Sequence, residues 1–71
     1  MNITSLQAEK ILKGNHAFKQ LGFSMLITRL KGLYAKDPSQ ATMQTCITEI
    51  NAFLGKFNTI MGEDFNTIRA L

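Results

Sequence analysis

Residues that reinforce very small domains are scarce in this 71-residue chain, which has one cysteine and one histidine. The lone Cys46 excludes a disulfide within the chain, and metal sites need several Cys, His, Asp or Glu side chains in register. A domain this short buries only about 60% of the surface that its unfolded chain exposes, so its core alone gives little stability. Since no cofactor is indicated either, we expect self-association or a permanent protein partner to supply the remaining stability.

Long hydrophobic runs are also missing. The longest run of large apolar side chains is Met25–Leu26–Ile27, far short of the roughly 20 residues that span a bilayer. Residues 1–12 lack the basic start and the apolar stretch of a signal peptide. A single cysteine suits a reducing compartment. These absences predict a cytoplasmic protein without a membrane span, and export by a pathway that reads no cleavable signal stays open.

No pattern of catalytic residues is present. The sequence places no nucleophile or orienting carboxylate beside His16, and the neighbours of Cys46 are uncharged, whereas reactive thiols need a basic, partly exposed setting. Glu63 and Asp64 are adjacent, and adjacent residues on a helix point in different directions. A phosphate-binding glycine loop, a zinc-ligand spacing and a nucleophile elbow are all missing. We therefore expect a protein that is not an enzyme, with His16 at the surface or in a helix cap and Cys46 packed.

Helical periodicity, in contrast, runs through the chain. It predicts two long helices, at about residues 16–35 and 38–62, with a short helix before them and another after them in one domain, 1–71. Thr4 and Gln7 have the spacing of a capping box, and Gly14-Asn15 suits the end of one helix and the start of the next. Because glycine can also lie inside a helix at a cost of about 1 kcal/mol, one continuous helix over residues 4–35 is the alternative.

The strongest break in the chain is Asp37-Pro38-Ser39. Proline disfavours helical geometry at the residue before it, and Asp37 can cap a helix whose first residue is Pro38. So short a connection makes the two long helices antiparallel neighbours. We expect Gly62 to end the second of them and Asp64 to cap a last segment, residues 65–71. The apolar stripes that should face each other are Phe23, Leu26, Ile27, Leu30, Leu33 and Tyr34 in the first helix and Met43, Ile47, Ile50, Leu54, Phe57 and Met61 in the second.

The second long helix has few charges, since only Glu49 and Lys56 are charged between residues 38 and 62. A helix with one solvated face normally carries more, so this helix is predicted to contact protein on more than one face. A solvated face of unusual composition is the alternative. Small and neutral side chains repeat every seven residues opposite its apolar stripe, and small residues let another helix approach closely. The candidate interface combines these rows with the second apolar side of the preceding helix: Phe18, Leu21, Met25, Thr45, Thr48, Ala52, Gly55 and Thr59.

The net charge of +3 is unevenly distributed. Residues 1–36 contain six basic residues and one acidic residue, or +5, and residues 37–71 contain two basic and four acidic residues, or −2. The halves can attract each other, and the basic half can meet an acidic partner. Its candidate basic patch is Lys10, Lys13 and Lys19. A nucleic-acid-binding regulator is therefore the alternative function, although the basic residues are spread around their helices rather than aligned on one face.

The pair of long helices joined at Asp37-Pro38-Ser39 is similar to small hairpin proteins of bacterial secretion machinery, such as needle subunits and their helical chaperones. Small phage and plasmid accessory proteins resemble it too. The resemblance covers the layout and one turn, and it implies a role for no particular residue. We expect an all-α helical hairpin, completed as a bundle by self-association, that serves as a protein–protein interaction or assembly module. Its partner would be a second copy, with a dimer favoured, or a helical partner protein.

Overall fold

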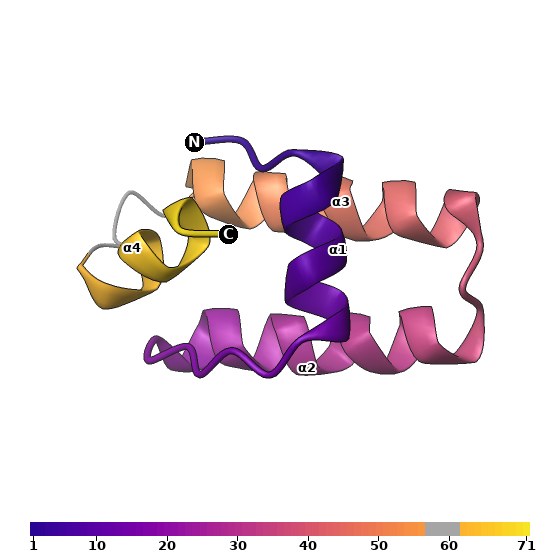
Figure 1. Ribbon diagram of the computed structural model, residues 1–71, viewed down its shortest axis with the longest axis horizontal. Coiled ribbons are helices and arrows are strands. Elements are labelled where there is room, and N and C mark those ends of the chain that lie inside the picture. Colours follow the sequence, from indigo (N-terminus) through magenta and orange to yellow (C-terminus); the bar gives the residue numbers. More distant parts are fainter. Residues whose placement is uncertain (57–61) are drawn as a thin grey trace.

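The computed structural model is all-helical over the residues that it describes, 1–56 and 62–71, which confirms the all-α prediction. α2 and α3 lie side by side, and α1 crosses both of them (Figure 1). The chain between α2 and α3 is short, as the break at Pro38 predicts. The four helices of the described residues are α1, Ser5–Lys13; α2, Leu21–Lys36; α3, Gln40–Lys56; and α4, Glu63–Arg69.

α1 begins at the predicted capping box. The Thr4 hydroxyl accepts a hydrogen bond from the backbone N–H of Gln7 at 3.1 Å, and the Gln7 side chain accepts one from the backbone N–H of Thr4 at 2.9 Å. Gly14 follows the last helical residue with extended backbone angles, so a single helix over residues 4–35 is excluded.

The buried side of α1 is formed by Ala8, Ile11 and Leu12, whereas Leu6 is exposed. Residues three and four apart share one face of a helix, so these three side chains point together at α2 and α3. Ala8 is completely buried, and its small side chain lets α1 approach the helices beneath it closely.

The prediction that the second helix starts at about residue 16 is wrong, because α2 begins at Leu21. The connector before it is held in a non-helical path by polar contacts to its neighbours. Lys31 Nζ donates to the Gly14 carbonyl at 2.6 Å, and His16 Nε2 donates to the Lys10 carbonyl at 3.2 Å. The Gly14 carbonyl lies just beyond the last turn of α1, where backbone acceptors lack partners within the helix, and the Lys10 carbonyl also accepts from the backbone N–H of Gly14 at 2.9 Å.

α3 begins at Gln40 rather than at Pro38, because Ser39 takes the capping position predicted for Asp37. Ser39 Oγ accepts from the backbone N–H of Thr42 at 3.1 Å, which is the contact that an N-cap side chain makes. Asp37 instead accepts from the Thr42 hydroxyl at 2.9 Å. The buried Thr42 thus joins both residues of the turn and fixes the path from α2 into α3.

The core is shared by all four helices and by Ile3. The predicted stripe of α2 is buried at Phe23, Ile27 and Leu30, whereas Leu33 is 39% exposed. Phe57 and Met61 of the predicted α3 stripe lie outside the described residues. So do the other residues just before Gly62, where we expect that helix to end. Gly62 has φ of +69° and precedes α4 as its N-cap. The buried apolar residues are Ile3, Ala8, Ile11, Leu12, Phe23, Ile27, Leu30, Met43, Cys46, Ile50, Leu54 and Ile68.

Polar contacts at both ends of the described chain complete the packing. The backbone N–H of Ile3 donates to the Asn51 side chain of α3 at 2.7 Å, and Lys10 Nζ of α1 donates to the Leu71 carbonyl at 2.7 Å. Ile68 of α4 is completely buried. The contact of Ile3, just before α1, therefore holds α1 against α3. Lys10 of α1 holds the residue that follows α4, Leu71.

Replacing Gly14 by alanine should destabilise the fold. A Cβ there would lie 2.7 Å from both the Lys10 carbonyl oxygen and His16 Nε2, and the carbonyl belongs to the backbone of α1. We expect Gly14→Ala to lower the free energy of unfolding by about 1–3 kcal/mol, measured by urea denaturation. Gly32→Ala is the matched control, because a Cβ there meets nothing within 4 Å and should stabilise α2 by about 0.5–1 kcal/mol. Equal stability changes in the two variants would contradict the contact at Gly14.

Candidate functional site

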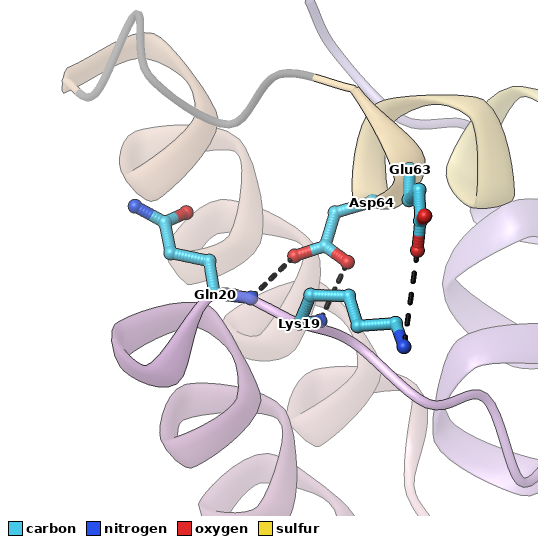
Figure 2. Close-up of a pocket in the computed structure, with 4 residues that line it drawn as sticks. All are labelled: Lys19, Gln20, Glu63 and Asp64. Atoms are coloured by element: carbon cyan, nitrogen blue, oxygen red, sulfur yellow. Dashed lines mark hydrogen bonds and ion pairs between the residues drawn. The ribbon is translucent and has the colours of Figure 1, made fainter.

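A hollow of about 490 Å³ lies where the chain enters α2, between that point and the start of α4 (Figure 2). Asp64 of α4 is 3% exposed, and its carboxylate closes one side of the hollow. Its Oδ1 accepts from the backbone N–H of Lys19 at 2.6 Å, and its Oδ2 accepts from that of Gln20 at 2.8 Å. Gln20 is the N-cap residue of α2 and makes no capping hydrogen bond with its own side chain.

Asp64 therefore holds the start of a helix far from it in the sequence. The prediction that it caps residues 65–71 is wrong, because Gly62 is the N-cap of α4 and Asp64 lies in the first turn. A carboxylate at a helix N-terminus accepts from N–H groups that have no partner within the helix, and its charge is favourable with respect to the helix dipole. In this position the one negative charge is directed at α2 and also lies in the first turn of α4.

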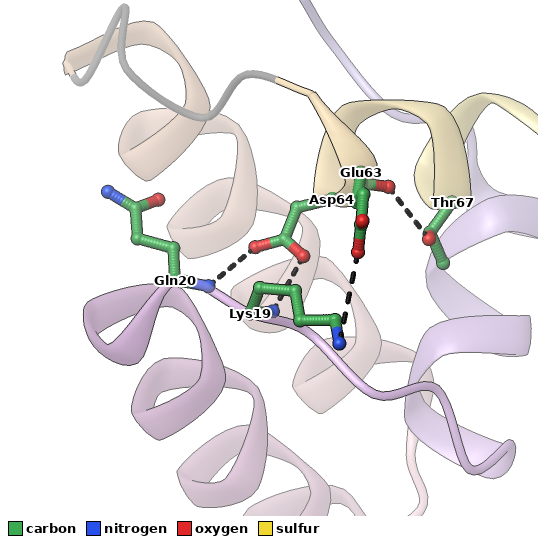
Figure 3. Close-up of polar contacts among 5 residues, drawn as sticks. All are labelled: Lys19, Gln20, Glu63, Asp64 and Thr67. Atoms are coloured by element: carbon green, nitrogen blue, oxygen red, sulfur yellow. Dashed lines mark hydrogen bonds and ion pairs between the residues drawn. The ribbon is translucent and has the colours of Figure 1, made fainter.

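The neighbouring acidic residue behaves differently. Glu63 Oε2 lies 3.8 Å from Lys19 Nζ, and both side chains are largely exposed. Its backbone carbonyl accepts from the Thr67 hydroxyl within α4 at 2.9 Å (Figure 3). The two carboxylates are thus engaged by different groups, one by backbone N–H groups and one by a lysine side chain, as the sequence predicts for adjacent helical residues.

The polar groups of this hollow join the start of α2 to α4. Both oxygens of Asp64 already accept hydrogen bonds. Gln20 Oε1 is buried and has no hydrogen-bond partner among the described residues, but its side chain extends away from Asp64 (Figure 2). Within residues 1–56 and 62–71, no three His, Cys, Asp or Glu side chains lie together as metal ligands would.

The candidate basic patch is divided between two places. Lys10 and Lys13 line a second hollow of about 320 Å³ with His16 and Leu71, whereas Lys19 lines the hollow at Asp64. Each lysine meets an acceptor within the chain: Lys10 the Leu71 carbonyl, Lys13 the Glu9 carboxylate at 3.3 Å, and Lys19 the Glu63 carboxylate. The structure therefore brings together only two of the three lysines.

Cys46 lies in the core, and His16 lies at the end of α1. The Cys46 side chain is completely buried, and burial raises the pKa of its thiol, which disfavours the reactive thiolate. His16 Nε2 donates to the Lys10 carbonyl, a contact typical of a residue that caps a helix end. Both placements agree with the expectation of a packed thiol and a capping histidine.

The candidate interface residues fall into two groups. Phe18 packs edge-to-face on the buried Phe23, with ring centroids 4.8 Å apart, so it belongs to the border of the core. Leu21 is 73% exposed and Met25 is 63% exposed, one turn apart on α2. Thr45, Thr48, Ala52 and Gly55 are exposed on α3, and Thr59 lies outside the described residues.

Two hydrogen bonds and one ion pair locate the side of α2 and α3 that faces away from α1. Lys31 reaches the end of α1 at Gly14, and Arg29 is two residues away, or about 200° around the helix. On α3, Asn51 holds the segment before α1 and Glu49 is likewise two residues away. Arg29 and Glu49 meet each other at 2.6 Å, and Glu49 raises the pKa of the Arg29 guanidinium. The face that carries this ion pair is thus opposite the one that α1 covers.

We call this surface the open α2–α3 face and define it by Met25, Leu26 and Arg29 of α2 and Glu49, Ala52, Phe53 and Lys56 of α3. A groove of about 250 Å³ runs along it, lined by Leu26, Ala52 and Phe53 together with Glu49 and Lys56. Gly22 of α2 lies close to Phe53, since a Cβ there would be 3.5 Å from the ring. The face therefore combines the exposed Met25 and the half-buried Leu26 and Phe53 with Lys56 and with one ion pair across two helices.

Comparison of the chain with protein-family models, with curated proteins and with solved structures finds no match. Among the described residues, no helix has the length and apolar character needed to cross a membrane.

The contact of Asp64 with α2 can be tested by substitution. Asp64→Ala removes the acceptor of two backbone N–H groups and should lower the free energy of unfolding by about 1–2 kcal/mol. Asp64→Asn retains an acceptor oxygen and should cause a smaller loss. Glu63→Ala is the matched control beside it, and we expect a change below about 0.5 kcal/mol because its ion pair is exposed. Urea denaturation measures all three, and equal losses at positions 63 and 64 would refute the assigned role.

Proposed function

We propose that this chain is a non-enzymatic protein–protein interaction or assembly module that acts through the open α2–α3 face. The observation that carries the proposal is the exposure of Met25 on α2, one turn before Arg29, whose partner Glu49 lines the groove with Leu26, Ala52, Phe53 and Lys56. An exposed large apolar side chain on the same face as a largely apolar groove is typical of a protein-binding surface. An adaptor, a chaperone-like protein or a structural subunit would use such a surface.

The composition of α3 supports the same surface. Thr45 and Ala52 are exposed on the side of the helix that carries Glu49, and a small side chain at Ala52 permits close approach of a helix from a partner. In this proposal α2 and α3 form the hairpin that the sequence predicts, and the partner completes it as a bundle. The partner would be a second copy, with a dimer favoured, or a helical partner protein. Function in the cytoplasm stays a prediction.

Nucleic-acid binding through the basic half is the alternative, and no contact favours it. Lys10, Lys13 and Lys19 each meet an acceptor within the chain, and they do not line a common hollow. Binding to a phosphate backbone needs several cations directed outward along one surface. The contacts therefore favour the interaction module.

Site-specific photo-crosslinking, carried out in the cells that naturally make this protein, tests the proposed function. A photoreactive residue placed at Met25 or at Ala52 should form a discrete adduct with another protein chain, because both positions lie on the open α2–α3 face. The same residue placed at Asn66, which is exposed on α4, is the control. Adducts from Met25 and Ala52 that are absent from Asn66 would support the proposal, whereas equal labelling at all three positions, or none, would refute it.

Gly55→Ala determines whether the interface extends to the far side of α3. A Cβ at Gly55 meets nothing within 4 Å in the single chain, so in the absence of a partner the substitution should stabilise the fold by about 0.5–1 kcal/mol. Gly32→Ala provides the control on α2. If Gly55 lies in a close contact, the added methyl group should weaken association, and light scattering will show a lower mass. A higher melting temperature with unchanged mass would remove Gly55 from the interface.

A further inference from the structure

α4 is too short to persist as a helix by itself. It has seven residues, Glu63–Arg69, and isolated helices shorter than about 12–15 residues are marginal in water. Ile68 is its one buried apolar side chain, and Phe65 packs against the core while remaining partly exposed. The helical form of α4 therefore depends on its contacts with the rest of the chain.

Two side chains of α1 hold the C-terminal end of α4. Gln7 Nε2 donates to the Ile68 carbonyl at 3.4 Å, and Lys10 Nζ donates to the Leu71 carbonyl at 2.7 Å. These carbonyls lack acceptor partners within the helix. The contact of Lys10 is exposed, so water can take the place of its ammonium group at little cost. The strongest attachments left to α4 are the buried side chain of Ile68 and that of Asp64.

The start of α2 depends on α4 in turn. The backbone N–H groups of Lys19 and Gln20 donate to the Asp64 carboxylate (Figure 2), and the Gln20 side chain makes no capping hydrogen bond. If Asp64 moved away with α4, both N–H groups would lose this acceptor. α2 would also lose the negative charge that is favourable at its N-terminus.

We infer that residues 62–71 are a strap that opens and closes together with the start of α2, residues 19–24, and that Asp64 couples the two. Opening of the strap uncovers the core beneath Ile68 and frays the first turn of α2. It leaves α1, α3 and the centre of α2 in place, because these share the rest of the buried core.

Opening of the strap would also affect one end of the open α2–α3 face. Gly22 lies in the first turn of α2, and a Cβ there would be 3.5 Å from the ring of Phe53. Fraying of that turn would therefore separate α2 from α3 at this end of the face. The inference does not depend on the proposed function, because it concerns a motion within a single chain.

Hydrogen exchange measured by NMR on the natural chain tests the coupling. The amides of Lys19 and Gln20 report on the start of α2, and those of Asn66 and Ala70 report on α4. The amide of Leu30, at the buried centre of α2, reports on global unfolding. We expect the protection factors of the first four amides to agree within about threefold and to be at least about tenfold below that of Leu30.

Ile68→Ala tests the coupling from the α4 side. It removes the apolar anchor of α4 but no hydrogen bond to α2, so exchange at the start of α2 should become faster by the same factor as exchange in α4, about tenfold or more. Ile68→Val makes the same test with a smaller truncation, and circular dichroism verifies that each variant remains helical.

Met43→Ala is the matched control. Met43 is also buried, but it lies near the start of α3, at the end of the helix pair away from α4 (Figure 1). The substitution should speed exchange at Leu30 through global unfolding. It should leave the four reporter amides unchanged, because their opening does not require the rest of the core to unfold.

The outcomes separate a coupled strap from independent motions. Equal acceleration at both places after Ile68→Ala supports the inference. Acceleration in α4 alone, or at neither place, overturns it, because α2 would then keep its start without the strap. Protection in the natural chain that is as high at all four reporter amides as at Leu30 also overturns it, since α4 would then open only when the whole chain unfolds. Much lower protection at Lys19 and Gln20 than in α4 overturns it too, because the Asp64 contact would then break while α4 stays closed.

Discussion

The carboxylate of Asp64 is the constraint on which the arrangement of the other elements depends. It receives the backbone N–H groups of Lys19 and Gln20 from the opposite half of the chain, so α2 can begin only where α4 meets it. Because α2 starts at Leu21, the preceding residues must span from α1 to that point in a non-helical path. This path sets Phe18 on Phe23 and brings Gly14 within reach of Lys31.

Placing α1 across the helix pair divides the surfaces of α2 and α3 into two kinds. The side beneath α1 buries Phe23, Ile27 and Leu30 of α2 against the apolar side chains of α3. The side away from α1 has no third helix of the described chain to complete it, and it carries the Arg29–Glu49 pair between the two helices. An exposed ion pair contributes little to stability by itself.

Local signals in the sequence predicted the elements well, and contacts between distant residues account for what it missed. The capping box at Thr4 and the break at Gly14 each depend on residues within one turn, and both appear as predicted. The start of α2 could not be predicted, since the carboxylate that fixes it is 44 residues from Gln20. The spacing of Arg29 and Glu49 gives no sign that they meet, because their approach depends on how α2 and α3 pack. Helical spacing also placed Phe18 on an outer face of the second helix. That placement requires the helix to include residue 18, whereas α2 begins at Leu21.

The sparse charge of α3 acquires a more specific explanation from this packing. A solvated face can tolerate threonine and alanine, and small residues alone would not distinguish an interface from such a face. What favours an interface is that the uncharged row of α3 lies beside exposed apolar side chains of α2 and not beside its lysines. Glu49 and Lys56 line the groove of this face, and Glu49 pairs with Arg29, so the charges beside the uncharged row are few and of both signs.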